Sequence, residues 1–249
     1  MLASMGLQSG WETRCWTMQI EGSVALVTGA HRGIGLAFAR ALVARGAAKV
    51  YAGVRRPGEF SEPGCEPLLL DVTNQQHIDA AAAKAHDVSI LINNAGIVAG
   101  PQLLQGSLDG ARREMEVNYF APWAVSRAFA PVLAANGGGT LVNMLSAASW
   151  RANPRTPGYA ASKAAEWSLT NALRLGLRDQ GTVVIGVHVG YVDTDATERL
   201  DVPKVPAAEV AEKTMDGIVR GDLEVLVDEA ARRAHSLLSG PLTSMYPQA

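Results

Sequence analysis

The chain has 249 residues, of which 48% are hydrophobic and 18% charged, and its formal net charge is −2. This apolar content is enough to bury a large core and argues against a disordered chain. The small net charge gives no reason to expect a nucleic acid or an anionic membrane surface as partner. No run of residues reaches the ~18 consecutive apolar positions of a membrane span.

The cysteines and histidines exclude two further classes of protein. Cys15 and Cys65 are the only cysteines, so we expect no disulfide framework and a reducing, cytoplasmic location. The five histidines show no metal-ligand spacing, and we expect no metal site. Residues 1–17 lack the apolar run of a signal peptide. We expect this leader to be disordered or to lie outside the fold, which then occupies residues 18–249 as one domain.

Beyond Met18, short β-branched runs alternate with longer alanine-rich runs. Strands are expected, in chain order, at 24–28, 49–54, 67–70, 89–93, 140–145, 183–189 and 224–227. Helices are expected between them at 34–45, 75–86, 108–136, 157–179 and 207–219. Apolar strands that alternate with helices predict an α/β fold, a doubly wound parallel sheet of about seven strands with helices on both faces.

A glycine-rich loop connects the first strand to the first helix. It reads Thr28-Gly29-Ala30-His31-Arg32-Gly33-Ile34-Gly35. Glycines allow a tight turn and close backbone approach to a pyrophosphate, and the helix N-terminus offers unpaired N–H groups. A strand before the loop and a helix after it are the context that a dinucleotide site requires. We therefore expect a cofactor to bind here at Gly29, His31, Arg32, Gly33, Ile34 and Gly35.

A second motif lies in the fourth predicted helix, which Pro157 opens. Tyr159 and Lys163 are four residues apart and share one helix face. An ammonium so placed can lower the pKa of a phenol from its usual value of about 10. Such a phenol can give or take a proton at a carbonyl oxygen near neutral pH. Ser146 precedes Tyr159 by 13 positions and can hold that oxygen by a hydrogen bond.

Together these motifs resemble the short-chain dehydrogenase/reductase family, in its single-domain branch with TGxxxGxG and YxxxK motifs. The likeness extends from Met18 to about Leu226. It implies a Rossmann fold, a nicotinamide cofactor, and hydride transfer between that cofactor and a carbonyl carbon. It also implies that the members associate through the long helix before the Tyr-x-x-x-Lys motif and the helix that carries it, so we expect a homodimer or homotetramer.

The resemblance assigns roles residue by residue. The catalytic set would be Asn118, Ser146, Tyr159 and Lys163, in which Lys163 also binds the nicotinamide ribose and Asn118 holds a water. The same likeness implies further cofactor contacts at Asp71, Val72, Asn93, Ala95, Gly96, Val192 and Thr194. One position departs from the family pattern, because Val189 stands where a proline usually precedes Gly190. This leaves the local turn, and with it the role of Val192, less well defined.

The end of the second strand indicates which cofactor is used. A site for NAD places an acidic residue there, whereas the 2′-phosphate of NADP requires cations. The sequence has Arg55 and Arg56 at this position, and Arg32 in the glycine loop could reach the same phosphate. These residues predict NADP(H). Arg55 and Arg56 could instead form a solvated turn.

Several side chains near these motifs admit two roles each. Ser149 could be the working hydroxyl instead of Ser146, or a turn former, and Asn118 could be an ordinary amide on a helix surface. Trp150, Arg151 and Arg155 are expected near the mouth of the substrate pocket, where the arginines would meet an anionic substrate or only solvent.

Three functions compete. The first is NADPH-dependent reduction of a ketone or aldehyde, a small-molecule substrate whose identity the sequence does not indicate. The second is an NAD-dependent alcohol dehydrogenase on the same fold, and the third is a regulator that senses NADP(H) without catalysis. The set of Ser146, Tyr159 and Lys163 argues against the third, because a sensor has no need of a tuned phenol.

Overall fold

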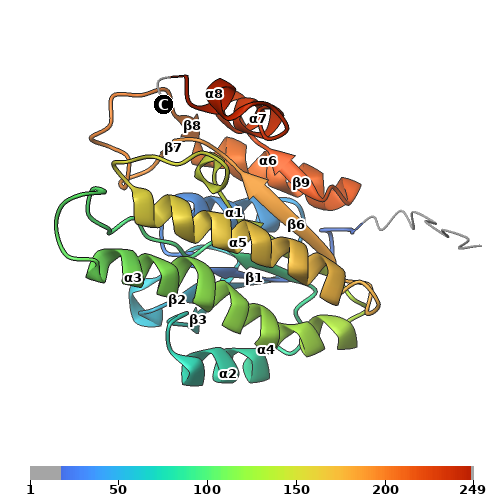
Figure 1. Cartoon of the computed structure of the whole chain (residues 1–249). Coiled ribbons are helices and arrows are strands. Elements are labelled where there is room, and N and C mark those ends of the chain that lie inside the picture. The colour runs from blue at the N-terminus through green and yellow to red at the C-terminus, as the bar shows by residue number, and fades with distance from the viewer. Residues whose placement is uncertain (1–17, 248–249) are drawn as a thin grey trace, which may run out of the picture.

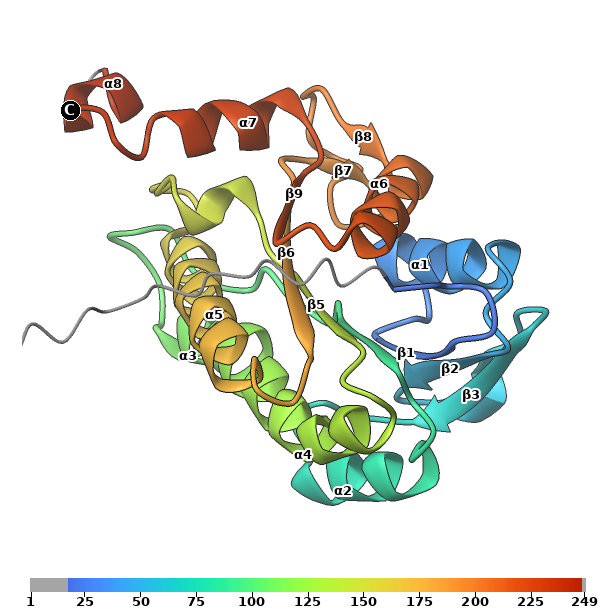
Figure 2. The ribbon, with the colours of Figure 1, turned by 90° about the vertical axis from the view of Figure 1, so that its right-hand side faces the viewer.

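The computed structural model describes residues 18–247, and its centre is a sheet of seven parallel strands (Figures 1 and 2). The leader 1–17, with Cys15, lies outside the described residues. The order across the sheet is β3-β2-β1-β4-β5-β6-β9, which confirms the predicted doubly wound arrangement. The strands are β1 (Val24–Thr28), β2 (Lys49–Val54), β3 (Cys65–Leu69), β4 (Ile90–Asn93), β5 (Thr140–Met144), β6 (Val183–His188) and β9 (Glu224–Leu226).

Both faces of the sheet are buried, as expected for nearly continuous apolar strands. Successive side chains in a strand point to opposite faces. In β1, Ala25 and Val27 therefore join the hydrophobic core on one side of the sheet, whereas Leu26 joins the core on the other side. The same alternation in β4 puts Ile92 on the first side and Leu91 on the second.

Helices supply the other half of each core. On one side, α1 (Gly33–Ala44) and α6 (Ala207–Arg220) pack through residues such as Phe38 and Ile218. On the other, α2 (Gln75–Lys84) and α4 (Ala121–Ala135) pack through residues such as Ile78 and Phe129. The helix α5 (Pro157–Gly176) lies beside α3 (Asp109–Met115) on this second side, as Figure 2 shows.

The strand order determines where a ligand can bind. From β1 the chain moves outward to β2 and β3, and it then returns to β4 on the opposite side of β1. The carboxyl ends of β1 and β4 thus flank a topological switch point, where open α/β sheets bind their ligands. The glycine loop follows β1 and the segment Asn94–Gly96 follows β4, so both lie at this point.

The structure corrects the expected helices in two places. The predicted helix over 108–136 is interrupted by a π-helical turn at Glu116–Phe120 between α3 and α4. Residues beyond 227 form α7 (Glu229–Ser236) and α8 (Leu242–Met245), which the sequence pattern did not indicate because both are short. In addition, β7 (Val192–Asp193) pairs with β8 (Val205–Pro206) and closes the base of the segment between them. No helix within residues 18–247 is long and apolar enough to cross a membrane.

Candidate functional site

The glycine loop has the backbone that its sequence predicts. Gly29 and Gly33 adopt positive φ angles of 66° and 57°, a region that glycine enters without steric strain. A Cβ on Gly35 would lie 2.3 Å from the carbonyl oxygen of Gly29, so only glycine fits there. In the described chain, the first turn of α1 has no acidic residue and no side-chain cap. Its N–H groups are thus left for an anion.

Two residues outside the predicted set hold this loop in place. The amide nitrogen of Asn94 donates to the carbonyl oxygen of Thr28 at 2.9 Å. The hydroxyl of Thr28 in turn accepts from the backbone nitrogens of Asn94 and Ala95 at 2.9 and 3.0 Å. These bonds join the ends of β1 and β4 across the switch point. The sequence signal for Asn94 was its place in Asn93-Asn94-Ala95-Gly96, but its partner could not be identified without the fold.

The three arginines predicted to select the cofactor are all exposed, but they differ in their contacts. Arg32 donates to Asp195 at 2.5 Å and Arg56 pairs with Glu59 at 3.2 Å. Both are surface pairs, which contribute little to stability and exchange readily for another anion. Arg55 makes no ion pair with any residue between 18 and 247, and its charge acts on Asp71. Of the three, Arg55 therefore has the guanidinium most available for a ligand.

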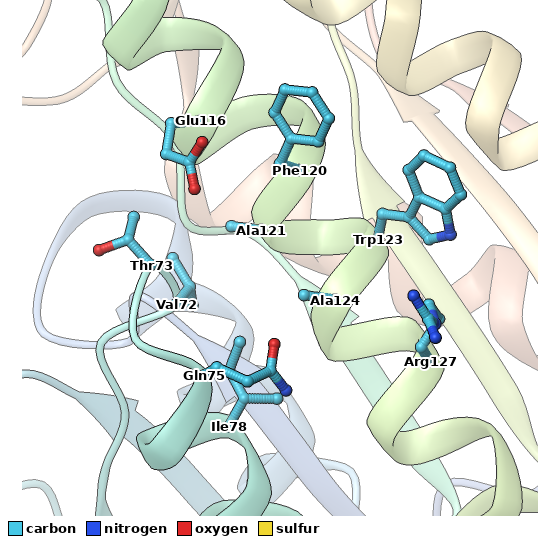
Figure 3. A pocket seen from close by; sticks show the side chains of 10 residues that line it. All are labelled: Val72, Thr73, Gln75, Ile78, Glu116, Phe120, Ala121, Trp123, Ala124 and Arg127. Carbon is cyan, nitrogen blue, oxygen red and sulfur yellow. The ribbon is translucent and has the colours of Figure 1, made fainter.

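Asp71 and Val72 follow β3 on the same side of the molecule. Partial burial would raise the pKa of Asp71, but hydrogen bonds from Thr73 and the charge of Arg55 outweigh it, so the pKa is lowered. Val72 lines a groove of about 400 Å³ between α2 and α4, and Figure 3 shows its side chain facing that groove. His31 is exposed, with its ring 6.4 Å from that of Phe60, and Ile34 is packed partly against the first core.

The predicted catalytic residues converge from three elements. Lys163 is buried in α5, and its ammonium donates to the carbonyl oxygen of Met144, at the end of β5, at 2.7 Å. Tyr159 lies one turn earlier on α5 and is half-buried. A Cβ on Gly96 would lie 3.3 Å from the amide oxygen of Asn118 and 3.7 Å from the ammonium nitrogen of Lys163. The segment after β4, the π-helical turn and α5 therefore meet beside the switch point.

Asn118 is fully buried, which rules out a surface amide at this position. Its side chain accepts from the backbone nitrogen of Ile97 at 2.8 Å and donates to the carbonyl of Ile97 at 2.9 Å. It also donates to the hydroxyl of Ser162 at 3.0 Å. The π-helical turn places one extra residue in the helix, and such turns are frequent at functional sites. Here the π-helical turn directs the side chain of Asn118 into the molecule, toward Ser162, the residue before Lys163.

Ser146 and Ser149 divide the roles that the sequence left open. The hydroxyl of Ser149 accepts from the backbone nitrogen of Ser146 at 3.3 Å and so completes a capping box around the short helix 147–149. The hydroxyl of Ser146 accepts from the backbone nitrogen of Ala148 at 3.1 Å and donates to Val189 at 3.4 Å. The bond to Val189 is long and weak, so the Ser146 hydroxyl can be redirected to a ligand.

A buried carboxylate organises the segment after β4. Glu114, on α3, accepts from the backbone nitrogens of Ala99 and Gly100, each at 2.8 Å, through the same oxygen. A Cβ added to Gly158, the neighbour of Tyr159, would lie only 2.3 Å from the other carboxylate oxygen of Glu114. Glu114 thus joins α3, this segment and the start of α5. Nothing in the sequence distinguishes Glu114 from a glutamate on a helix surface.

The turn after β6 is held by a carboxylate from the C-terminal part of the chain. Gly190 donates to the carboxylate of Asp228 at 2.9 Å, and the same carboxylate caps α7 at Ala231. Val192 is buried in the first core. Thr194 lies against the glycine loop, since a Cβ on Gly33 would be 3.3 Å from its methyl group. The segment after β6 and the glycine loop are therefore neighbours.

One expectation needs correction. Trp150 does not stand at a pocket mouth: it is 9% exposed and stacks on the fully buried His188, with ring centroids 3.7 Å apart. Stacking removes both rings from water, and burial lowers the pKa of His188 to about 3. Arg151 and Arg155 are exposed, in agreement with a solvated loop. Asn93 donates its amide to Ser126 and Asn143 in the interior, and its side-chain oxygen is buried without a partner among the described residues.

Comparisons with known proteins agree with this geometry. The family model described as short chain dehydrogenase matches residues 23–204. A solved short chain dehydrogenase from Burkholderia cenocepacia J2315, in complex with NADP, is 38% identical with a TM-score of 0.88, and the match covers 92% of this chain and 98% of that one. A 3-oxoacyl-(acyl-carrier-protein) reductase of Vibrio cholerae is 32% identical over 74% of this chain and 79% of its own length. A 7alpha-hydroxysteroid dehydrogenase of Escherichia coli K12 is 30% identical over 76% of this chain and 78% of its own.

Proposed function

This chain belongs to the short-chain dehydrogenase/reductase family of oxidoreductases, and on that premise we propose that it reduces a ketone or aldehyde to an alcohol with NADPH. Tyr159 is the proton donor in this proposal. The observation that carries it is the meeting of Lys163, Asn118 and Gly96 at the carboxyl end of the sheet, beside the glycine loop. A site that binds a dinucleotide and a group that transfers a proton are thereby adjacent.

The residues of the site fit a dinucleotide. The positive φ angles of Gly29 and Gly33 and the lack of space at Gly35 leave the backbone bare along the loop. The uncapped N-terminus of α1 adds the positive end of a helix dipole. A pyrophosphate is the group that this combination recognises best. The other proposed cofactor contacts all lie at the end of the sheet where the parallel strands have their carboxyl ends. They are Asp71, Val72, Asn93, Ala95, Gly96, Val192 and Thr194.

Four residues of the chain perform the proton chemistry in this proposal. The hydroxyl of Ser146 donates a hydrogen bond to the carbonyl oxygen of the substrate, and the phenol of Tyr159 donates the proton to that oxygen. Lys163 stabilises the phenolate that remains and binds the ribose, while Asn118 holds a water that links Lys163 to solvent. The cofactor supplies the hydride when it is bound. In the reverse direction Tyr159 would take the proton from the hydroxyl of an alcohol, and the oxidised cofactor, when bound, would supply the acceptor for the hydride.

A paired titration and activity screen tests the proposal. NADPH and NADH are titrated separately into the purified protein and followed by fluorescence. The oxidation of NADPH is then recorded over a panel of aliphatic and aromatic ketones and aldehydes. We expect binding of NADPH and turnover of at least one carbonyl. Binding of NADPH without turnover across the panel would favour the sensor, and tighter binding of NADH would favour the NAD-dependent alcohol dehydrogenase.

Replacing Arg55 with Asp should weaken the binding of NADPH far more than that of NADH. The Arg55 guanidinium follows β2, where no acidic residue takes the ribose 2′-OH, and it has no ion pair to break within residues 18–247. We expect the Kd for NADPH to rise about tenfold or more, since an arginine–phosphate bond is replaced by repulsion, and the Kd for NADH to change little. Arg233→Asp on α7 is the matched control. Equal weakening of both cofactors would contradict the proposed role.

We also propose that the enzyme is a homodimer or homotetramer that uses the outer faces of α4 and α5. Part of the apolar surface expected there serves the core, because Val125 and Phe129 are fully buried. Phe120, Trp123 and Leu175 remain 48%, 40% and 78% exposed. Figure 3 shows Phe120 and Trp123 projecting from the helix beside the groove. Exposed apolar groups of this size are typical of an interface.

Trp123→Glu should therefore dissociate the oligomer. We expect the wild-type protein to sediment at a multiple of 26.2 kDa at micromolar concentration, and the variant to sediment as a monomer, because an unpaired charge would be buried at the interface. Leu104→Glu places the same charge at a residue that is 91% exposed in a loop, and should leave the assembly intact. A wild-type monomer would refute this assignment.

The free thiol of Cys65 is consistent with the cytoplasmic location that we propose.

A further inference from the structure

One buried charge in the site lies outside the family motifs. Glu166 follows Lys163 by one helical turn on α5, and its carboxylate lies 2.6 Å from the ammonium. The two side chains are 2% and 5% exposed. Ion pairs at this spacing are common on helix surfaces, where they contribute little. Here the pair is inside the protein, so each charge depends on the other to offset the loss of water.

The contacts of Lys163 leave one of its donors for a ligand. An ammonium has three N–H bonds. One is taken by Glu166 at 2.6 Å and one by the carbonyl oxygen of Met144 at 2.7 Å. Gly96, whose lack of a side chain leaves space next to the ammonium, belongs to the segment proposed to bind the cofactor. The two acceptors therefore fix the orientation of the ammonium and leave one N–H for the ribose.

The charges around Lys163 come from three elements. Burial would lower the pKa of Lys163, but the charges of Glu166 and Tyr159 on its own helix outweigh it, so the pKa is raised. From β6, His188 is neutral at physiological pH because burial lowers its pKa to about 3. From α3, Glu114 directs its carboxylate to Ala99 and Gly100. Among these groups, Glu166 alone is hydrogen-bonded to the ammonium within the described part of the chain.

We propose that Glu166 is a positioning residue, which keeps Lys163 protonated in its buried site and directs its remaining N–H toward the cofactor ribose. This inference rests on the proposed function, because it takes Lys163 as a cofactor ligand. Glu166 itself touches neither cofactor nor substrate. Its effect is thus expected in the pH dependence of cofactor binding.

Glu166→Gln is the decisive variant. The amide keeps the size and an oxygen acceptor for Lys163 but removes the counter-charge. Burial raises the pKa of Glu166 to about 7, so the wild-type carboxylate is largely charged in an alkaline titration. Removing this charge lowers the pKa of Lys163, and the ammonium is lost at a lower pH. The Kd for NADPH, measured by fluorescence between pH 7.5 and 10, should then rise up to about tenfold per pH unit above the lowered pKa.

Three comparisons make the outcome specific. The wild-type Kd should stay nearly constant over the same range, and kcat should fall with pH in parallel with affinity in the variant. Glu166→Asp keeps the charge and should restore much of the wild-type profile. Glu209→Gln removes the carboxylate of an exposed lysine pair on α6 and should leave the profile unchanged. A loss of affinity by the same factor at every pH in Glu166→Gln would mean a packing role and would overturn the inference.

Failure to fold would also be informative. If Glu166→Gln does not yield folded protein, the double variant Lys163→Met, Glu166→Gln should fold, because no uncompensated charge is then buried. An unfolded double variant would overturn the inference, since the defect would not depend on Lys163. Wild-type protein that binds no NADPH would refute the proposed function, which is a separate result from an unaltered pH profile in the variant.

Discussion

Replacing Tyr159 with Phe is expected to lower kcat by about 10²- to 10⁴-fold, the usual contribution of a positioned general acid. The substitution removes the transferable proton and keeps the ring. Cofactor affinity should be nearly unchanged, because Lys163 keeps its bonds to Met144 and Glu166 without the phenol. The measurement is kcat for the best carbonyl of the panel, together with the Kd for NADPH from fluorescence titration.

A matched control separates chemistry from packing. Tyr51 is buried in β2 within the second core, and its hydroxyl accepts from Lys49 at the amino end of β2, so Tyr51→Phe removes a hydroxyl away from the carboxyl end of the strands. This variant should keep kcat within the range of the wild type. Turnover retained in Tyr159→Phe would mean that another group is the acid. A large rise in the Kd for NADPH would mean that the phenol serves mainly in binding.

Gly35→Ala is expected to abolish cofactor binding while the sheet remains folded. The added Cβ would meet the carbonyl oxygen of Gly29 at 2.3 Å and the amide nitrogen of Asn94 at 2.6 Å. Both atoms belong to the bonded framework that shapes the loop, so the loop must move. We expect the Kd for NADPH to rise by about 100-fold or more, which corresponds to roughly 3 kcal/mol. Circular dichroism should show the secondary structure of the wild type.

The control for this prediction is Gly176→Ala at the end of α5. Beyond its chain neighbours and the nearby backbone of its own helix, a Cβ at Gly176 meets no atom of residues 18–247 within 4 Å. Alanine is a better helix former than glycine, so this variant should bind NADPH normally and be more stable by up to about 1 kcal/mol. Normal binding in Gly35→Ala would contradict the fit of the loop to a pyrophosphate. A loss of folding would show that Gly35 is needed for packing of α1 on the sheet.

Local patterns were sufficient to predict the sheet. A strand buried on both faces is apolar along nearly its whole length, and Val24–Thr28 and Ile90–Asn93 are apolar at every position but the last, wherever the rest of the chain lies. The glycine loop could be predicted equally well, because the spacing of its glycines follows from the backbone conformation that the loop adopts. The short helices α7 and α8 were missed because they carry too few turns for a periodic pattern to develop.

The hydrogen-bond partners of polar side chains could not be predicted from local sequence patterns. Asn94, Glu114 and Asp228 each bond to backbone far away in the sequence. A helix pattern shows which residues share a face, but it does not show whether a polar residue faces water or a neighbouring segment. Trp150 was placed at a pocket mouth for this reason, whereas its stacking on His188 depends on the approach of β6.

The sequence by itself determined the fold class, the glycine loop and the spacing of Ser146, Tyr159 and Lys163, because these depend on periodicity and on contacts within one helix or turn. The tertiary structure alone decided that Glu166 is buried against Lys163 and that Asn118 turns inward. The physical reason is burial: the same glutamate one turn from a lysine is a weak surface pair in water. Packed inside the protein near the end of β5, it becomes the counter-charge on which a buried ammonium depends.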